Sequence, residues 1–196
     1  MKTLLSTSLA LLAFAGVARA DMSAVPSGAY DVDKLHGYIL FSYSHFGLSN
    51  PSVGFNDFEA VLNLDAESPE NSTIEVSIDA ASVDSRVPIF NEHLNSADWL
   101  DTAAHPEITF RSTGIEAAGE DSYTVTGDLT VKGITKPVTL QATINAAMMH
   151  PLQEVPVVGV SATGTVLRSD YGLEQYAPDV TDELTLTIEV EMLKRQ

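Results

Sequence analysis

The chain has 196 residues, no cysteine, and 27 acidic against 10 basic residues, for a formal net charge of −17 at pH 7. The absence of cysteine excludes disulfides, a thiol nucleophile, a lipidated N-terminal cysteine and cysteine-based metal sites. An acidic surface repels phosphate groups, so nucleic acid is not an expected partner. The acidic residues form no block, which favours a role in solubility over a specific docking surface.

Residues 1–20 have the features of a cleaved secretory signal peptide. Lys2 supplies a positive start, an apolar stretch covers residues 4–17, and Ala18-Arg19-Ala20 is a small-x-small cleavage pattern. The apolar stretch is short for a bilayer span, so a retained anchor is the less favoured alternative. We therefore expect a mature single domain of residues 21–196 in the periplasm.

Period-two alternation of apolar and polar residues dominates the rest of the chain and predicts strands with one buried face. Turn residues such as Lys132-Gly133 separate most of these segments. The apolar rows cover residues 39–45, 58–64, 74–80, 108–112, 123–131, 138–144, 158–166 and 184–192.

Two segments depart from this alternation. Residues 82–101 read as a connection with a short helix, in which Phe90, Leu94 and Trp99 share one side, and Pro106 ends the segment. Such an apolar stripe is more often a lid packed on a sheet than a binding feature. Residues 171–182, with Pro178, form a second irregular connection.

Eight antiparallel strands with one apolar face can close on themselves, and a barrel of that size holds either packed side chains or one ligand. The sequence therefore predicts an all-β protein, a single eight-stranded antiparallel barrel with a short helical flap. A two-sheet sandwich would show the same alternation.

The inward rows mix large and small residues. Aromatic residues at Phe41, Tyr43, Phe58, Phe110 and Tyr123 alternate with alanines, glycines and a serine on the same faces. A solid core shows this mixture too, but small residues aligned on neighbouring strands would leave a tunnel.

Catalytic and metal motifs are not evident. The five histidines form no His-x-His or His-x-x-x-His pair, which leaves only a zinc site assembled from distant parts, and no Gly-x-Ser-x-Gly elbow is present. His45 shares the first inward row and is either a buried hydrogen-bonded imidazole or a contact to a ligand head group. Arg168 either ties the barrel internally or pairs with an anionic head group.

The order of these signals resembles the YceI-like family of exported lipid-binding proteins. The resemblance covers essentially the whole mature chain. The sequence differs from the usual pattern of the family at Gly37, Trp99, Tyr171 and residues 146–157. Its motifs include Tyr30-Asp31-Val32-Asp33, His45-Phe46-Gly47, Asp98-Trp99-Leu100-Asp101, His105-Pro106-Glu107, the stretch from Gly127 to Val138, and Arg168-Ser169-Asp170-Tyr171-Gly172.

The resemblance implies a lipocalin-like barrel with an elongated cavity for polyisoprenoids or other long-chain amphiphiles, including isoprenoid quinones. We expect a periplasmic protein that binds and transports or stores such a lipid, without catalysis or cofactor. The alternatives are an accessory protein that docks on a membrane redox or stress-response partner, and, less favoured, a lipid-modifying enzyme. A homodimer would have to form through loops or the flap. The predicted ligand contacts are Phe41, Tyr43, His45, Phe58, Phe90, Leu94, Trp99, Phe110, Tyr123, Leu129 and Arg168.

Overall fold

The structure of the protein is a computed structural model that describes residues 20–196. All of the predicted signal peptide except Ala20 lies outside the described residues, so its cleavage stays a prediction. Within residues 20–196, no helix is both long enough and apolar enough to cross a membrane.

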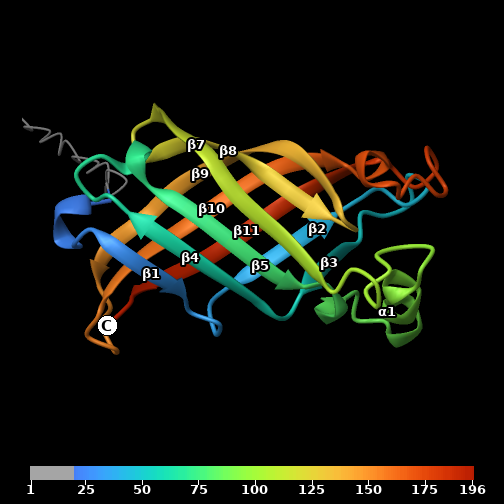
Figure 1. Ribbon diagram of the computed structural model, residues 1–196, viewed down its shortest axis with the longest axis horizontal. Coiled ribbons are helices and arrows are strands. Elements are labelled where there is room, and N and C mark those ends of the chain that lie inside the picture. Colours follow the sequence, from blue (N-terminus) through green and yellow to red (C-terminus); the bar gives the residue numbers. More distant parts are fainter. Residues whose placement is uncertain (1–19) are drawn as a thin grey trace, which may run out of the picture.

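Eight strands form a closed ring in which every neighbouring pair is antiparallel (Figure 1). The ring closes where β1, near the start of the chain, pairs with β11, at its end. The predicted barrel and its strand number are therefore confirmed over the two-sheet alternative. In order around the ring the strands are β1 (Gly28–Val32), β4 (Phe58–Leu64), β5 (Thr73–Asp79), β7 (Glu107–Gly119), β8 (Ser122–Val131), β9 (Ile134–Met149), β10 (Pro156–Leu167) and β11 (Glu183–Lys194).

The membership of the ring differs from the prediction at one strand. The alternating segment at residues 39–45 contains β2 (Tyr38–Ser42), which pairs with residues 185–189 of β11. The ring is closed instead by β1, which pairs with residues 192–194 of the same strand. At five residues, β1 is too short to show a convincing alternation.

β1 and β2 thus lie end to end along β11 and are separated by the turn at residues 33–37. The strand paths of β4 and β5, the next two around the ring, are likewise each divided into two shorter strands. β3 (Ser52–Phe55) pairs with β2 and precedes β4, while β6 (Val83–Asp84) pairs with β3 and follows β5. At this end the wall between β6 and β7 is completed by helical structure and not by a further strand.

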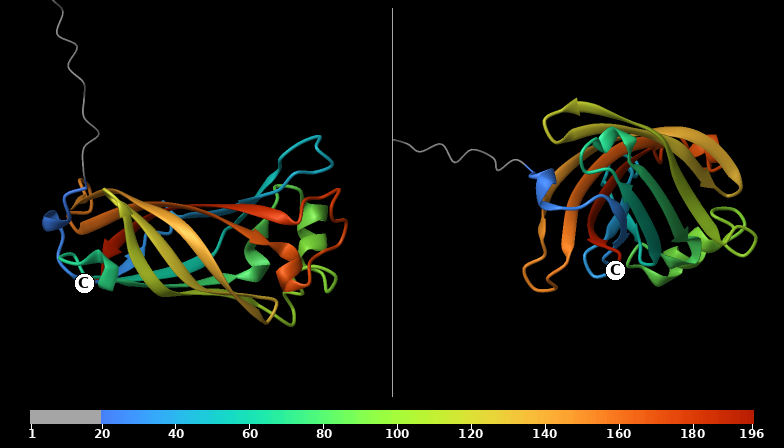
Figure 2. Two further views of the ribbon diagram at one scale, coloured as in Figure 1. Left: turned by 90° about the horizontal axis from the view of Figure 1, so that it is seen from above. Right: turned by 60° about the vertical axis from the view of Figure 1, so that its left-hand side comes forward.

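The predicted helical flap is confirmed as α1 (Pro88–Asn95). Pro88 occupies the first turn, where its missing N–H costs nothing, and Leu94 is the buried residue of the helix. Figure 2 shows α1 at the same end of the barrel as the β2–β3 loop and residues 171–182. Short 3₁₀ turns complete the structure: η1 (Met22–Ala24), η2 (Pro69–Asn71), η3 (Ala80–Ser82) and η4 (Arg168–Tyr171).

The opposite end, near the C-terminus, contains the most deeply buried side chains. Tyr30, Val158 and Met192 are fully buried there. The hydroxyl of Tyr30 donates a hydrogen bond of 2.6 Å to the carbonyl of Pro26, which satisfies its polar atom without opening the core. This packing closes the barrel around β1 and β11.

A candidate ligand cavity

The barrel encloses a cavity of about 280 Å³, lined by inward residues of every ring strand except β1 and by residues of β2 and β3. Its wall runs from Leu64 and Met192 near the closed end to Leu94 and Trp99 at the flap. On β11 alone, Leu184, Leu186, Ile188, Val190 and Met192 line it. Eight residue steps at about 3.3 Å each make this row about 26 Å long. The cavity is therefore elongated and suits a chain-like molecule.

Two glycines of the inward faces allow neighbouring side chains to lie against the wall. A Cβ at Gly127 would lie 2.4 Å from Cζ of Phe110, and a Cβ at Gly164 would lie 2.6 Å from Cδ2 of Leu140. The space beside these two glycines is thus already occupied by Phe110 and Leu140. Small inward residues do not open the cavity directly here; they let large side chains lie flat and leave the centre free.

The cavity wall is almost wholly apolar. Its lining is dominated by Leu, Ile, Val and Phe, and among residues 20–196 Arg168 is the one ionisable cation in it. Four of the five guanidinium N–H groups of Arg168 donate to backbone carbonyls, those of Leu173, Gln175, Val180 and Thr181. Arg168 is 4% exposed, so its main structural role is to hold residues 171–182 against the barrel.

Burial keeps the nearby phenol neutral. It raises the pKa of Tyr171 to about 12, with a smaller contribution from the charge of Asp170. Burial also lowers the pKa of the Arg168 guanidinium, and the carboxylates of Asp182 and Glu174 oppose that shift. Tyr171 therefore presents a neutral phenol to this part of the cavity.

The helical flap and residues 171–182 close one end of the cavity together. Leu94, Trp99 and Leu100 line its interior. The rings of Trp99 and Tyr176 stack at 6.3 Å between centroids, and Nε2 of Gln175 donates to the carbonyl of Asp98 at 3.0 Å. The two segments thus form one connected cover.

The structure places most of the predicted contact residues in the cavity wall. Tyr43 and Phe90 pack beside the wall in the cluster around Val53 and Val83, and His45 is exposed in the loop after β2. Their contact with a ligand stays a prediction, as does that of the others. The predicted residues in the wall are Phe41, Phe58, Leu94, Trp99, Phe110, Tyr123, Leu129 and Arg168.

Sequence reasoning missed several wall residues. Phe55 lies on the four-residue strand β3, Leu100 follows α1, and Leu173 lies in the irregular segment after η4. None belongs to a long alternating row, so periodicity gave no signal for them. The apolar character of Leu100 beside Trp99 was the one available indication.

The side chains in residues 20–196 that could jointly hold a metal ion are Asp33, His36 and Glu191. Glu191 lies between the inward residues Val190 and Met192 on β11, so it faces the outside of the barrel. This group is therefore separate from the cavity.

The sequence and the fold agree on a family. A family model described as the YceI-like domain matches residues 30–192. The chain belongs to the YceI-like family. UPF0312 proteins of Azotobacter vinelandii and Pectobacterium carotovorum are 33% and 34% identical to it, over 98% and 100% of this chain and 100% and 98% of theirs. The resemblance found in the sequence is thus confirmed.

Several solved structures share the barrel. The YceI protein of Campylobacter jejuni has a TM-score of 0.72 and 28% identity, over 78% of this chain and 90% of that one. BcnA of Burkholderia cenocepacia has a TM-score of 0.73 and 24% identity, over 82% and 98%. A protein of Saccharophagus degradans described as a polyisoprenoid-binding domain has a TM-score of 0.62 and 15% identity, over 85% and 98%.

Proposed function

We propose that this protein binds a long-chain isoprenoid or similar amphiphilic lipid in its barrel and carries or stores it in the periplasm without modifying it. The observation that carries this proposal is the elongated, almost wholly apolar cavity that runs from Met192 to the flap. The polyisoprenoid-binding description of the neighbour from Saccharophagus degradans supports the same ligand class.

The energetics favour recognition of the chain over recognition of a head group. Each methylene buried in such a cavity contributes about 0.8 kcal/mol, so a long chain gains affinity without any charged contact. Arg168 uses four of its N–H groups on backbone carbonyls, and the other lining side chains are mainly hydrocarbon. We therefore expect the polar end of the ligand at one end of the cavity, where a quinone ring is as acceptable as an alcohol or a carboxylate.

Periplasmic action is the part of the proposal that rests on residues 1–20, with their positive start, apolar stretch and Ala18-Arg19-Ala20 cleavage pattern. An apolar chain needs a protein shield to exist in an aqueous compartment, since its exposed surface is costly in water. A closed ring of strands around an apolar interior is suited to that task.

Native mass spectrometry after gentle purification tests the proposal directly. We expect a long-chain lipid to co-purify in a ratio of one per chain. Leu129→Glu, which places a charge in the wall, should abolish its uptake, because an unpaired buried carboxylate is costly. Thr126→Glu is the matched control, since it adds the same charge to an exposed position on the same strand.

A second variant keeps the test decisive if Leu129→Glu does not fold. Ala142 lies in the cavity wall, so Ala142→Phe fills the cavity without adding charge and should also reduce uptake. A wild-type protein that stays empty and takes up no isoprenoid from vesicles would contradict the proposal. So would full uptake by a folded Ala142→Phe variant.

A further inference from the structure

A polar cluster lies on the outside of the barrel, where the strand path beside β11 is interrupted. β1 pairs with β11 up to Met192, and β2 resumes the pairing at Glu189. The turn at residues 33–37 bridges this gap, and Glu191 of β11 lies opposite it. The backbone N–H of Asp33 donates to the carbonyl of Glu191 at 2.8 Å, which fixes the turn against the strand.

Asp33 is the buried member of the cluster, at 8% exposure. Its Oδ1 accepts the backbone N–H of Leu35 at 2.9 Å. Its Oδ2 accepts from Nδ1 of His36 at 2.9 Å and, more weakly, from Nε2 of Gln153 at 3.4 Å. The carboxylate is thus held in one orientation and faces the imidazole.

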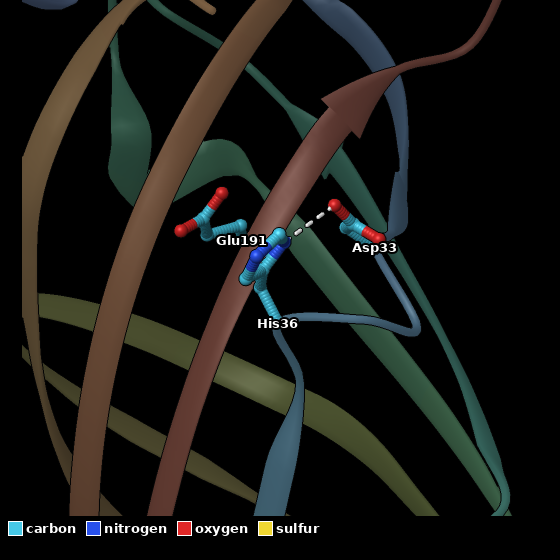
Figure 3. A group of neighbouring side chains, drawn as sticks. All are labelled: Asp33, His36 and Glu191. Atoms are coloured by element: carbon cyan, nitrogen blue, oxygen red, sulfur yellow. Dashed lines mark hydrogen bonds and ion pairs between the residues drawn. The ribbon is translucent and has the colours of Figure 1, made fainter.

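His36 lies between two carboxylates. One ligand atom from each of Asp33, His36 and Glu191 lies within 4.8 Å of the other two, and the imidazole ring stands between the two acids (Figure 3). The His36 and Glu191 side chains are 52% and 41% exposed, so both can adjust their positions. The cluster combines one nitrogen donor with two oxygen donors.

A second histidine, His150 in the β9–β10 turn, lies near Glu191. Nε2 of His150 lies 3.9 Å from Oε2 of Glu191. Nδ1 of His150 accepts the backbone N–H groups of Leu152 and Gln153, so in the neutral ring Nε2 carries the proton and presents it to Glu191. At 3.9 Å this is an electrostatic contact and not a hydrogen bond, and His150 is not among the three residues that could jointly hold a metal ion.

Within residues 20–196, the possible cationic partners of these carboxylates are two histidines, His36 beside Asp33 and His150 beside Glu191. Across residues 20–196, no lysine or arginine nitrogen lies within 4.0 Å of Asp33 or Glu191. Asp31, two residues earlier, shows the contrast, because it forms an ion pair with Arg195. Two carboxylates beside two neutral imidazoles leave a local excess of negative charge that a bound cation would neutralise.

We propose that Asp33, His36 and Glu191 bind a divalent transition-metal ion of the zinc class. Imidazole with carboxylates is a ligand set that suits such ions, and three protein ligands leave a position for water. Metal–ligand distances of about 2.0–2.2 Å require the donor atoms to draw together, which the half-exposed His36 and Glu191 side chains permit. The bound ion ties the turn to β11 at the interruption in the barrel wall.

Tag-free protein, stripped of metal with EDTA and dialysed, is the sample for the test. Calorimetric titration with Zn²⁺ should give one site per chain, and Co²⁺ should give visible absorption bands that Zn²⁺ displaces. Zn²⁺ should also raise the unfolding temperature, because an ion that binds the folded chain stabilises it.

Matched variants distinguish the site from the acidic surface in general. His36→Gln and Glu191→Gln should each weaken Zn²⁺ binding at least tenfold. His93→Gln, on α1, and Glu189→Gln, two residues from Glu191 on the same face of β11, should leave it unchanged. Circular dichroism and unfolding without metal confirm that each variant is folded.

Three results would overturn the site: no saturable binding by the wild type, equal losses in Glu189→Gln and Glu191→Gln, or Co²⁺ bands that persist in His36→Gln. The readouts involve no lipid, so they are independent of the proposed carrier function.

Discussion

The ring of Phe110 lies over the backbone of Gly127 on the neighbouring strand, and this contact determines how much of the barrel interior is empty. A methyl group on Gly127 would lie 2.4 Å from Cζ and 2.5 Å from Cε2 of Phe110 and 2.6 Å from the carbonyl oxygen of Arg111. The backbone oxygen cannot move easily, so the ring would have to move toward the cavity. One added methyl group at Gly127 would therefore affect both the stability of the barrel and the volume of its cavity.

Gly127→Ala should lower the free energy of unfolding by about 1–3 kcal/mol, the usual cost of overpacking. It should also weaken binding of long-chain lipids, because the displaced Phe110 ring takes up cavity space. Urea unfolding and lipid titration measure the two effects. Gly159→Ala is the control, since its added methyl would meet nothing closer than Cβ of Asn145 at 3.9 Å. Equal stability of the two variants would contradict the packing argument.

At the scale of elements, the flap is held at its start by one carboxylate. Asp84 of β6 accepts from Nδ2 of Asn91 at 3.0 Å, from the backbone N–H of Arg86 at 2.7 Å and from Nδ2 of Asn56 at 3.3 Å. These bonds, led by that of Asn91, lower the pKa of Asp84 below its usual value of 3.8. Helix α1 is thereby tied to the interrupted strand path.

The lowered pKa of Asp84 determines the direction in which stability changes with pH. The contribution of Asp84 to stability is fully present above about pH 3.8, and it is lost as pH falls through the lower folded-state pKa. Asp84→Asn should therefore lower the urea midpoint at pH 6, and its difference from wild type should shrink below pH 3.8. A difference that stays constant from pH 6 to pH 3 would contradict this role.

Arg168 performs the corresponding task for residues 171–182. Replacing it with Gln removes donors from four backbone carbonyls and should cost on the order of 3 kcal/mol. Amide hydrogen exchange should rise within residues 171–182 first. Arg195→Gln is the control: Arg195 is exposed and pairs with exposed Asp31, so its loss should leave stability and exchange nearly unchanged. Uniform exchange in Arg168→Gln would contradict a local anchor.

At the scale of the whole molecule, an enclosed apolar cavity means that the barrel lacks part of its core until a ligand fills it. A ligand that binds only the folded barrel adds about 2.7 kcal/mol at a free concentration of 100 times Kd. Delipidated protein should therefore unfold on the order of 5–10 °C below the lipid-bound form, from the usual 2–4 °C per kcal/mol for this size. Differential scanning calorimetry on both forms, with Ala142→Phe as the variant that should not respond, measures this.

The long alternating rows made most of the ring predictable from the sequence, because β7 to β11 each bury one face over ten or more residues. β1, β3 and β6 are too short to carry a period. His45 was assigned to an inward row, but β2 ends at Ser42 and the chain turns, with the N–H of His45 bonded to the carbonyl of Ser49. Asp33 and His36 are only three residues apart, but Glu191 comes from the last strand, so the cluster is complete only once the ring closes.

The pairing of β1 with β11 also constrains when the barrel can close during folding. Tyr30 pairs with Lys194, a sequence separation of 164 residues, so the first strand of the ring can pair only after the last has been made. Contacts of such separation form slowly, because the chain entropy between them must be given up first. Since a chain is made from its N-terminus, the barrel cannot be sealed while synthesis is still under way. Its apolar interior stays accessible from the side until the last strand joins the first.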